Sequence, residues 1–405
     1  MRSSGGDLRS RLANLHRGGP LGQDRAAPSL SERLRRAGRR SLNGEAPDDS
    51  AECQLAERIG GKQIAPGLIL TTERVPFTPH GSMASHSLLW KQGEYPGTTL
   101  LALDTETTGL AGGSGTTAFL IGIAVRVPGD RIELRQWLLT RFSAEALMLG
   151  ELAKAVGEEF TLLSYNGKSF DLPLLSTRFR LHRSADPLVG FPHLDLLPAV
   201  RRVFTGSWSD CRLASAERHL LNRARVDDLP GSAAPEAWRD WLTRGRMEEL
   251  IGVLRHNRQD LLSLFALTDA LARIYAGDLG PEADVVALAR FHARAGRMRM
   301  AMEILEYRQS VLGMEGRQFL ANLYKRAKRW EEAVEIWKND TANGSLKARI
   351  ELAKYYEHIA HDPVAALQIA ADAEDLSGHV DDALQLRVAR LNARCNARPW
   401  NGSLF

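Results

Sequence analysis

Two carboxylates, Asp104 and Glu106, stand two positions apart directly after the apolar residues 100–103. Such a short apolar run with polar flanks is typical of a buried strand, in which residues i and i+2 point to the same face. Two acids held together repel each other unless a cation lies between them. The pair therefore predicts a site for Mg²⁺ or Mn²⁺ at the end of a strand, since both ions prefer oxygen ligands. The alternative is a strand that runs into a polar, solvated turn.

A third acid, Asp171, follows the short apolar segment 161–164 and the turn sequence Asn166-Gly167. If segment 161–164 is a strand beside the first one, Asp171 arrives near Asp104 and Glu106. Alone, an acid in the first turn of a helix is commonly only a helix cap. The neighbouring Phe170 offers a ring on which a base could stack, or else it is an ordinary core aromatic.

A fourth acid, Asp260, lies in the long helical pattern 247–275, four residues after His256. Residues four apart share one helix face, so this pair is either a surface pair or part of the same site. In the second case Asp260 adds a fourth carboxylate. His256, whose ordinary pKa is near neutral, is then the candidate general base.

Four carboxylates from three segments suit two metal ions about 3.5–4 Å apart, which together bind the attacking and leaving oxygens of a phosphodiester. In such a site metal charge, and not a covalent nucleophile, stabilises the transition state. We find no Gly-x-Ser-x-Gly motif in the sequence that would indicate a competing serine mechanism.

The elements that must position these acids form an α/β pattern. Apolar runs at 100–104, 118–127 and 132–139 predict three successive strands; residues 144–158 then have helical periodicity, and 161–164 predict a fourth strand. One crossover returns the chain beside its first strand, giving a mixed sheet flanked by helices. Glycines in the first link, residues 109–115, do not match a dinucleotide or P-loop fingerprint.

Three motifs carry a resemblance to a known superfamily. They are Asp104-Thr-Glu106-Thr-Thr-Gly-Leu, Asn166-x-x-x-Phe170-Asp171 and His256-x-x-x-Asp260, and they resemble the exonuclease motifs of the DEDD, or DnaQ-like, ribonuclease H-fold superfamily. The spread of the motifs is most similar to YprB-type ribonuclease H-like proteins, over residues 99–275.

The resemblance implies a ribonuclease H-like fold and 3′→5′ exonucleolytic hydrolysis of single-stranded DNA or RNA with Mg²⁺ or Mn²⁺. It also implies that Thr107, Thr108, Leu110 and Asn166 border the terminal nucleotide. One departure concerns the base, because the superfamily commonly has Tyr four residues before the last Asp or His five before it. His256 stands at the Tyr spacing, and one residue is about 100° of helix rotation.

The flanking regions predict further parts of the chain. Residues 1–50 are rich in Gly, Ser, Pro and Arg and predict a disordered basic segment, either a nucleic-acid-binding arm or a solvated tail. Residues 51–98 predict a lead-in segment that packs on the catalytic domain, which spans residues 99–278.

Residues 281–398 contain a repeat. The sequence from Leu288 matches that from Leu320 at a spacing of 32, and a third copy begins at Leu352. Each copy predicts two amphipathic helices joined at Gly296, Lys328 or Asp362, which resembles tetratricopeptide-type hairpins. Such repeats bind a protein or peptide partner, or serve as a structural buttress.

Composition limits the class of protein. The chain has 405 residues, 44% hydrophobic residues and a formal net charge of +4, which is compatible with a polyanionic partner. No apolar run reaches the ~20 residues of a membrane helix, and the three cysteines have no C-x-x-C spacing. We therefore expect a cytoplasmic protein without a membrane partner. The main hypothesis is a metal-dependent nuclease; the alternative is a catalytically idle nucleic-acid-binding or scaffold protein that works through its helical repeats.

Overall fold

The computed structural model describes residues 47–78, 83–90, 96, 98–109, 115–225, 228–377 and 382–396. The predicted basic segment falls outside this range except for its last four residues, and so does Leu110. The first helix, α3 (Asp49–Arg58), is capped by the Asp48 side chain.

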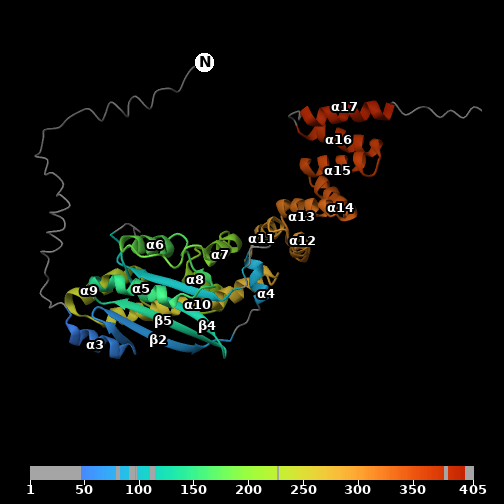
Figure 1. Cartoon of the computed structure of the whole chain (residues 1–405). Coiled ribbons are helices and arrows are strands. Elements are labelled where there is room, and N and C mark those ends of the chain that lie inside the picture. The colour runs from blue at the N-terminus through green and yellow to red at the C-terminus, as the bar shows by residue number, and fades with distance from the viewer. Residues whose placement is uncertain are drawn as a thin grey trace, which may run out of the picture.

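A seven-stranded sheet forms the centre of the first part of the chain (Figure 1). Its strands, in spatial order, are β1 (Lys62–Ala65), β2 (Leu68–Pro76), β5 (Arg131–Leu139), β4 (Ala118–Val127), β3 (Leu100–Thr107), β6 (Thr161–Ser164) and β7 (His193–Asp195). β3 pairs antiparallel with β4 but parallel with β6, and β6 pairs parallel with β7. The sheet is therefore mixed, as the sequence predicted, with β6 beside β3.

Two strands arise where the sequence predicted a separate lead-in. β1 and β2 lie in the sheet itself, and β2 pairs with β5 along its whole length. Residues 62–76 are thus one edge of the sheet and not a layer packed on it. In the sequence only residues 68–72 have a strand-like pattern, because the second half of β2 is mostly exposed.

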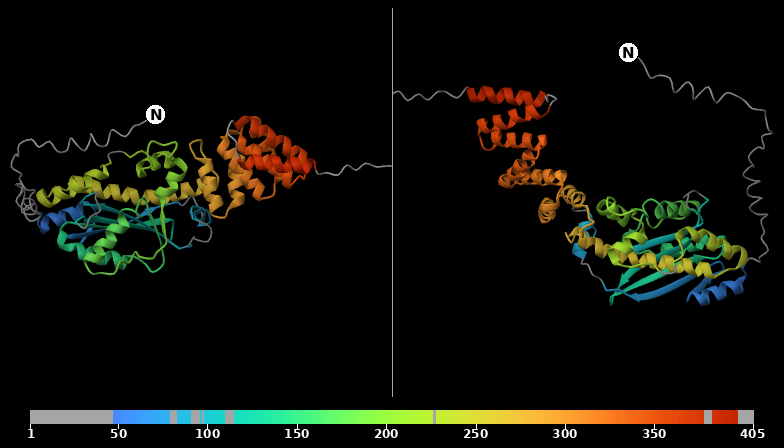
Figure 2. Two further views of the ribbon diagram at one scale, coloured as in Figure 1. Left: turned by 90° about the horizontal axis from the view of Figure 1, so that it is seen from above. Right: turned by 180° about the vertical axis from the view of Figure 1, so that it is seen from behind.

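Helices cover both faces of the sheet. One apolar cluster joins the sheet to α5 (Glu145–Ala155), α6 (Asp171–Leu181) and α9 (Ala234–Arg244). The other cluster joins it to α7 (Leu196–Phe204), α8 (Leu213–Leu221) and the C-terminal half of α10 (Glu248–Tyr275). Figure 2 shows α10, in yellow, lying along the sheet, where it contacts β3, β4 and β5.

Short helices complete this part of the chain. They are α4 (Met83–His86), η1 (Ser87–Leu89), η2 (Phe142–Ala144) and η3 (Gly231–Ala233). His86 is buried and bonds Asp269 of α10 through Nε2 at 2.7 Å, which ties α4 to the long helix.

Successive helices after α10 stack into an array that extends away from the sheet (Figure 1). They are α11 (Val285–Arg294), α12 (Met298–Tyr307), η4 (Gln309–Val311), α13 (Met314–Arg326), α14 (Trp330–Ala342), α15 (Leu346–His358), α16 (Pro363–Ser377) and α17 (Asp382–Asn396). In each of three successive helix pairs, the turn between the two helices contains a residue with positive φ. These residues are Gly296 (α11 to α12), Lys328 (α13 to α14) and His361 (α15 to α16). The 32-residue repeat of the sequence is thus a repeat of helical hairpins, with one extra residue in the third.

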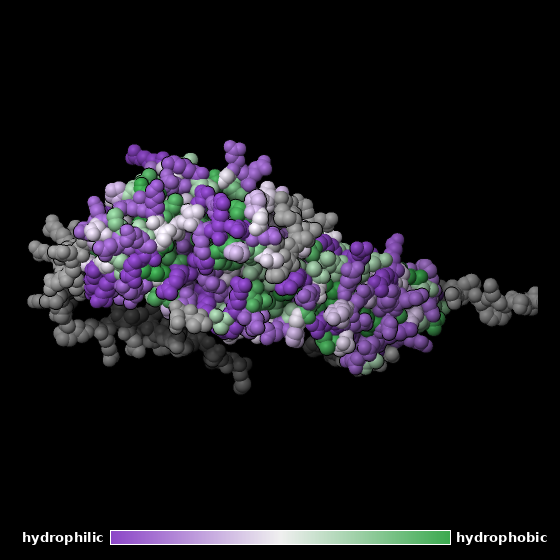
Figure 3. Space-filling model, turned by 90° about the horizontal axis from the view of Figure 1, so that it is seen from below, coloured by the Kyte–Doolittle hydropathy of each residue, from purple (hydrophilic) through white to green (hydrophobic). Residues whose placement is uncertain are grey.

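The array is packed on the sheet domain through α7 and α10. Tyr275 and the α11 residue Leu288 belong to one continuous apolar cluster, and Arg297 donates to the Leu88 carbonyl oxygen at 3.0 Å. The face of the molecule in Figure 3 is mostly hydrophilic, with small hydrophobic areas between. None of the described helices is long and apolar enough to cross a membrane.

Candidate active site

The end of β3 places Asp104 and Glu106 on one face of the sheet, toward α10. Alternation sends Leu101 and Leu103 to the opposite face, where they join the cluster of α5 and α6. A register shift between Glu106 and Thr107 marks a β-bulge against β4. Bulges re-aim side chains next to the point where a strand ends, and this one lies directly beside the acids.

Asp104 is held from α10. The Asn257 side-chain amide donates to the Asp104 carboxylate at 2.7 Å, and Gln136 of β5 donates to the Asn257 oxygen at 2.8 Å. Asn257 is fully buried. The close approach of α10 depends on Gly122 in β4, since a Cβ there would lie 2.2 Å from Asn257 Oδ1.

Asp171 reaches the site from the first turn of α6. Thr105 donates to its Oδ1 at 2.6 Å, and Thr105 belongs to the opposite side of β3 from Asp104 and Glu106. Asp171 still lies close enough to raise the pKa of both Asp104 and Glu106 by charge repulsion. β6 beside β3 brings the third acid to the same sheet end, as the sequence predicted.

Asp260 and His256 lie one turn apart on α10; Asp260 lies close enough to Asp104 and Glu106 to raise the pKa of both, and His256 lies beside Asp260. His256 Nε2 is 3.6 Å from Asp260 Oδ2, while its Nδ1 bonds the Asp228 carboxylate at 2.8 Å. An Nδ1–H that donates to Asp228 leaves Nε2 as the acceptor nitrogen. Burial opposes the charge of Asp228, but the bonds from His256 and Arg225 outweigh it and lower its pKa.

Arg225 supplies the main positive charge of the site, and the sequence analysis did not identify it. Its guanidinium pairs with Glu217 of α8, with Asp228 at 2.9 Å and with Asp260. Glu217 is fully buried, so this arginine is its counter-charge. A helix end followed by two arginines and then two aspartates gave no recognisable motif, and only the fold brings Arg225 against α10.

Burial disfavours the charged forms of all four acids, and repulsion from the other site acids adds to this for Asp104 and Glu106. Burial raises the pKa of Asp104 well above its ordinary value, and Asp260, Asp171 and Glu106 raise it further. Burial, then Asp260 and Asp171, raise the pKa of Glu106 to about 8. Burial also raises the pKa of Asp171, to about 6, and that of Asp260 despite His256 and Arg225. Together the four acids carry more negative charge than the neighbouring Arg225 neutralises.

The chemistry of the four acids suits a divalent cation, but their present arrangement does not group them around one. The four acids offer hard oxygen donors whose repulsion a cation would relieve, which is the chemistry that Mg²⁺ and Mn²⁺ require. Within the described part of the chain, however, no three His, Cys, Asp or Glu side chains are grouped so that they could hold an ion. Asp104 is bonded to Asn257, Asp171 to Thr105 and Asp260 to Arg225, so three of the four acids already have partners.

The remaining residues predicted to border a nucleotide occupy the turns around the acids. Thr107 donates to the Gly109 carbonyl oxygen at 2.9 Å, and Thr108 accepts from the Thr117 amide at 3.0 Å. Asn166 has a φ of +68°, and its backbone N–H donates to Asp195 Oδ1 at 2.7 Å. Asp195 is thus the acid that holds this turn, while the Phe170 side of the turn faces solvent.

Phe170 precedes α6 as its N-terminal cap residue and is 56% exposed. The alternative of a core aromatic is therefore wrong for this residue. An exposed ring next to Asp171 has the surface on which a base can stack.

Comparisons with known proteins identify the family of the domain that contains these residues. Residues 101–272 match the model of the RNase H superfamily, a range that includes β3, α6 and α10. A protein of Bacillus subtilis (strain 168), named "Uncharacterized protein YprB", is 34% identical over 325 residues, which cover 76% of this chain and 78% of that protein. This chain belongs to the RNase H superfamily, as a homologue of YprB.

Membership of the RNase H superfamily indicates the broad chemistry. Nucleases of this superfamily hydrolyse phosphodiester bonds and typically use divalent metals. The four acids at the end of β3 lie in the matched range and have the donor type for such ions. Arg225, Asp228 and Asn257 are the RNase H domain residues of this site that sequence reasoning missed, because their partners are distant in the chain.

Proposed function

We propose that this chain is a 3′–5′ exonuclease that removes nucleotides from single-stranded DNA or RNA with two Mg²⁺ or Mn²⁺ ions. The observation that supports the proposal is that β3, α6 and α10 bring Asp104, Glu106, Asp171 and Asp260 to one end of the sheet, close enough for Asp171 and Asp260 to raise the pKa of Asp104 and Glu106. Acids that are buried or half-buried this close to one another are costly for stability, and a cation-dependent reaction gives them a purpose.

In this proposal Asp104, Glu106, Asp171 and Asp260 hold the ions. Bound there, the ions would supply the positive charge that stabilises the negative charge developing on a phosphodiester. His256 acts as the general base, with Nε2 accepting a proton from water while Asp228 fixes the ring through Nδ1. Asn257 orients Asp104, and Phe170 stacks on the terminal base, bordered by Thr107, Thr108, Leu110 and Asn166.

The chain is proposed to divide into an exonuclease domain at residues 99–278 and tetratricopeptide-like repeats at 281–398 that bind a protein or peptide. The three cysteines Cys53, Cys211 and Cys395 are free, as in a protein of a reducing compartment such as the cytoplasm.

The test is a panel of DNA and RNA oligonucleotides labelled at the 5′ end, incubated with Mg²⁺ or Mn²⁺. We expect a ladder of products shortened from the 3′ end, its loss with EDTA, and its loss in the variants Asp104→Asn and Glu106→Gln. His256→Ala should lower kcat more than it raises KM; an unchanged kcat would remove His256 from the mechanism. Cuts within a circular single strand would show an endonuclease instead.

A second function is favoured by one observation. Arg225 already pairs with Asp260, and the described acids do not form a ready metal-binding group. An idle domain that binds nucleic acid without cutting it would have this arrangement. If the wild-type protein shortens no substrate with any of the metals, yet binds oligonucleotides, this second function is correct.

A further inference from the structure

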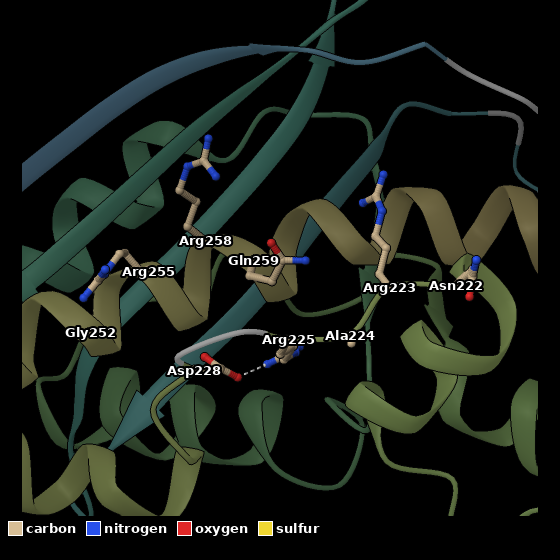
Figure 4. A pocket seen from close by; sticks show the side chains of 9 residues that line it. All are labelled: Asn222, Arg223, Ala224, Arg225, Asp228, Gly252, Arg255, Arg258 and Gln259. Carbon is tan, nitrogen blue, oxygen red and sulfur yellow. Dashed lines mark hydrogen bonds and ion pairs between the residues drawn. The ribbon is translucent and has the colours of Figure 1, made fainter.

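A groove of about 780 Å³ runs along the outer side of α10, next to the proposed active site (Figure 4). Its second wall is the segment Asn222 to Arg225 with Asp228, which follows α8 and passes alongside the helix. The groove is separate from the acids of β3, none of which lines it.

Arginines dominate the lining. Arg255 and Arg258 project from α10, and Arg223 and Arg225 come from the opposite wall, whereas Asp228 is the acid of the lining (Figure 4). A concave surface lined by charges of one sign focuses the potential and attracts ions of the other sign. Four arginines against one acid favour an anionic ligand for this groove.

Two of these arginines already form ion pairs with carboxylates. Arg225 pairs with Glu217, Asp228 and Asp260, and Arg258 pairs with Glu73 of β2 through two hydrogen bonds. These bonds fix both guanidinium groups in place.

The other two, Arg223 and Arg255, are exposed, and neither forms an ion pair with a carboxylate of the described residues. Their guanidinium groups are available to an incoming ligand. The planar fork of donors on arginine matches two oxygens of one phosphate.

The groove leads to the acids around α10. At about 100° per residue, Arg255 and Gln259 lie on adjoining positions of the helix surface, followed by His256 and then Asp260. At the opposite wall, Asp228 bonds His256 and Arg225 bonds Asp260. A strand whose end is at the acids can thus continue along α10 into the groove.

We propose that this arginine groove, formed by Arg223, Arg255 and Arg258, binds the phosphodiester backbone of a single nucleic-acid strand, some nucleotides away from the phosphate that is cleaved. The identity of the ligand depends on the proposed nuclease function. The groove gives affinity for longer strands and takes no part in bond cleavage.

The experiment compares Arg223→Gln/Arg255→Gln with the wild type, and with the control Arg131→Gln/Arg299→Gln, which removes the same charge from two exposed positions elsewhere. Fluorescence anisotropy measures the Kd of labelled single strands of about 12 and about 3 nucleotides at several salt concentrations, in EDTA so that no cleavage occurs. Thermal unfolding checks that each variant is folded.

We expect the groove variant to bind the longer strand on the order of tenfold more weakly, with a salt slope lower by about 1–2, because two phosphate contacts are lost. Its Kd for the short strand, and both Kd values of the control, should stay the same. Equal Kd and salt slope in the groove variant and the control, or no binding of the longer strand by the wild type, would overturn the proposal. Loss of binding in a protein that cleaves nothing would support the groove while the exonuclease proposal fails.

Discussion

Asn257 of α10 fixes Asp104 of β3 from 153 positions away in the sequence: its Nδ2 lies 2.7 Å from the carboxylate Oδ2 and 3.2 Å from the Asp104 backbone oxygen. Gln136 donates to the Asn257 side-chain oxygen and so holds the Asn257 amide in this orientation. Loss of a residue that orients a metal-binding carboxylate lowers metal affinity or activity by about 10–100-fold.

Replacing Asn257 should therefore impair the site without touching a proposed ligand. We predict that Asn257→Ala lowers the cleavage rate or the Mn²⁺ affinity by about 10–100-fold. Steady-state kinetics and calorimetric titration measure the two quantities. Asn339→Ala, at an exposed position of α14, is the control, and equal effects of the two variants would show that Asn257 has no such role.

Gly122 permits α10 to lie against β4, and a methyl group there has no room. A Cβ at this position would be 2.2 Å from Asn257 Oδ1 and 2.6 Å from Leu261 Cδ1. We predict that Gly122→Ala lowers the free energy of unfolding by about 1–3 kcal/mol and reduces activity, because α10 must shift. Urea titration measures the stability.

The matched control is Gly150→Ala in α5, where an added Cβ meets no atom within 4 Å. This variant should be neutral or more stable by up to about 1 kcal/mol, because alanine favours a helix. The prediction fails if Gly122→Ala is as stable as this control.

Arg225 balances the buried charge of Glu217 and contacts Asp260. Its side chain is only 12% exposed, so its loss leaves buried acids without a counter-charge. We predict that Arg225→Gln lowers the free energy of unfolding by about 3–5 kcal/mol in EDTA. Added Mn²⁺ should raise the Tm of this variant more than that of the wild type, because the ion replaces the missing charge. A Tm shift of equal size in both proteins would contradict this interpretation.

His292 makes stability depend on pH. Burial, together with Arg297 and Arg202, outweighs the opposing Tyr275 hydrogen bond and lowers the pKa of His292 from 6.5 to about 4. The folded state thus binds fewer protons than the unfolded state between these values, so stability is present above pH 6.5 and is lost as the pH falls toward 4. The expected slope from this residue reaches about 1.4 kcal/mol per pH unit.

Urea titrations between pH 7 and 4.5 measure this slope, with His292→Leu as the comparison. The variant should have a shallower slope, since it lacks the titrating ring. Identical slopes would assign the acid sensitivity to other groups.

Local pattern was enough to predict much of the sheet. The strands 100–104, 118–127 and 161–164 are long or apolar enough to be recognised, and the 32-residue spacing revealed the hairpins of the second part of the chain. Residues 68–72 of β2 also have a strand-like pattern, whereas the edge strand β1 and the exposed second half of β2 were not recognised, because exposure weakens the apolar signal.

The four acids could be proposed from the sequence because three of them follow short apolar segments and the fourth, Asp260, has helical spacing from His256. Their partners could not. Arg225, Asp228 and Asn257 act through contacts between elements that only the folded chain brings together, and the Thr105 hydrogen bond to Asp171 crosses from β3 to α6. Sequence patterns report local structure, whereas these contacts depend on how α8 and α10 pack.

In the proposed function, Asp104, Glu106, Asp171 and Asp260 share divalent cations. The most direct test of this sharing is the number of Mn²⁺ ions bound per chain, measured by electron paramagnetic resonance or calorimetric titration on the wild type and on Asp104→Asn. We predict about two ions per wild-type chain, with at least one lost in the variant while its thermal unfolding in EDTA is unimpaired. Absence of Mn²⁺ binding to the wild type, or the same number of ions in both proteins, would contradict the account.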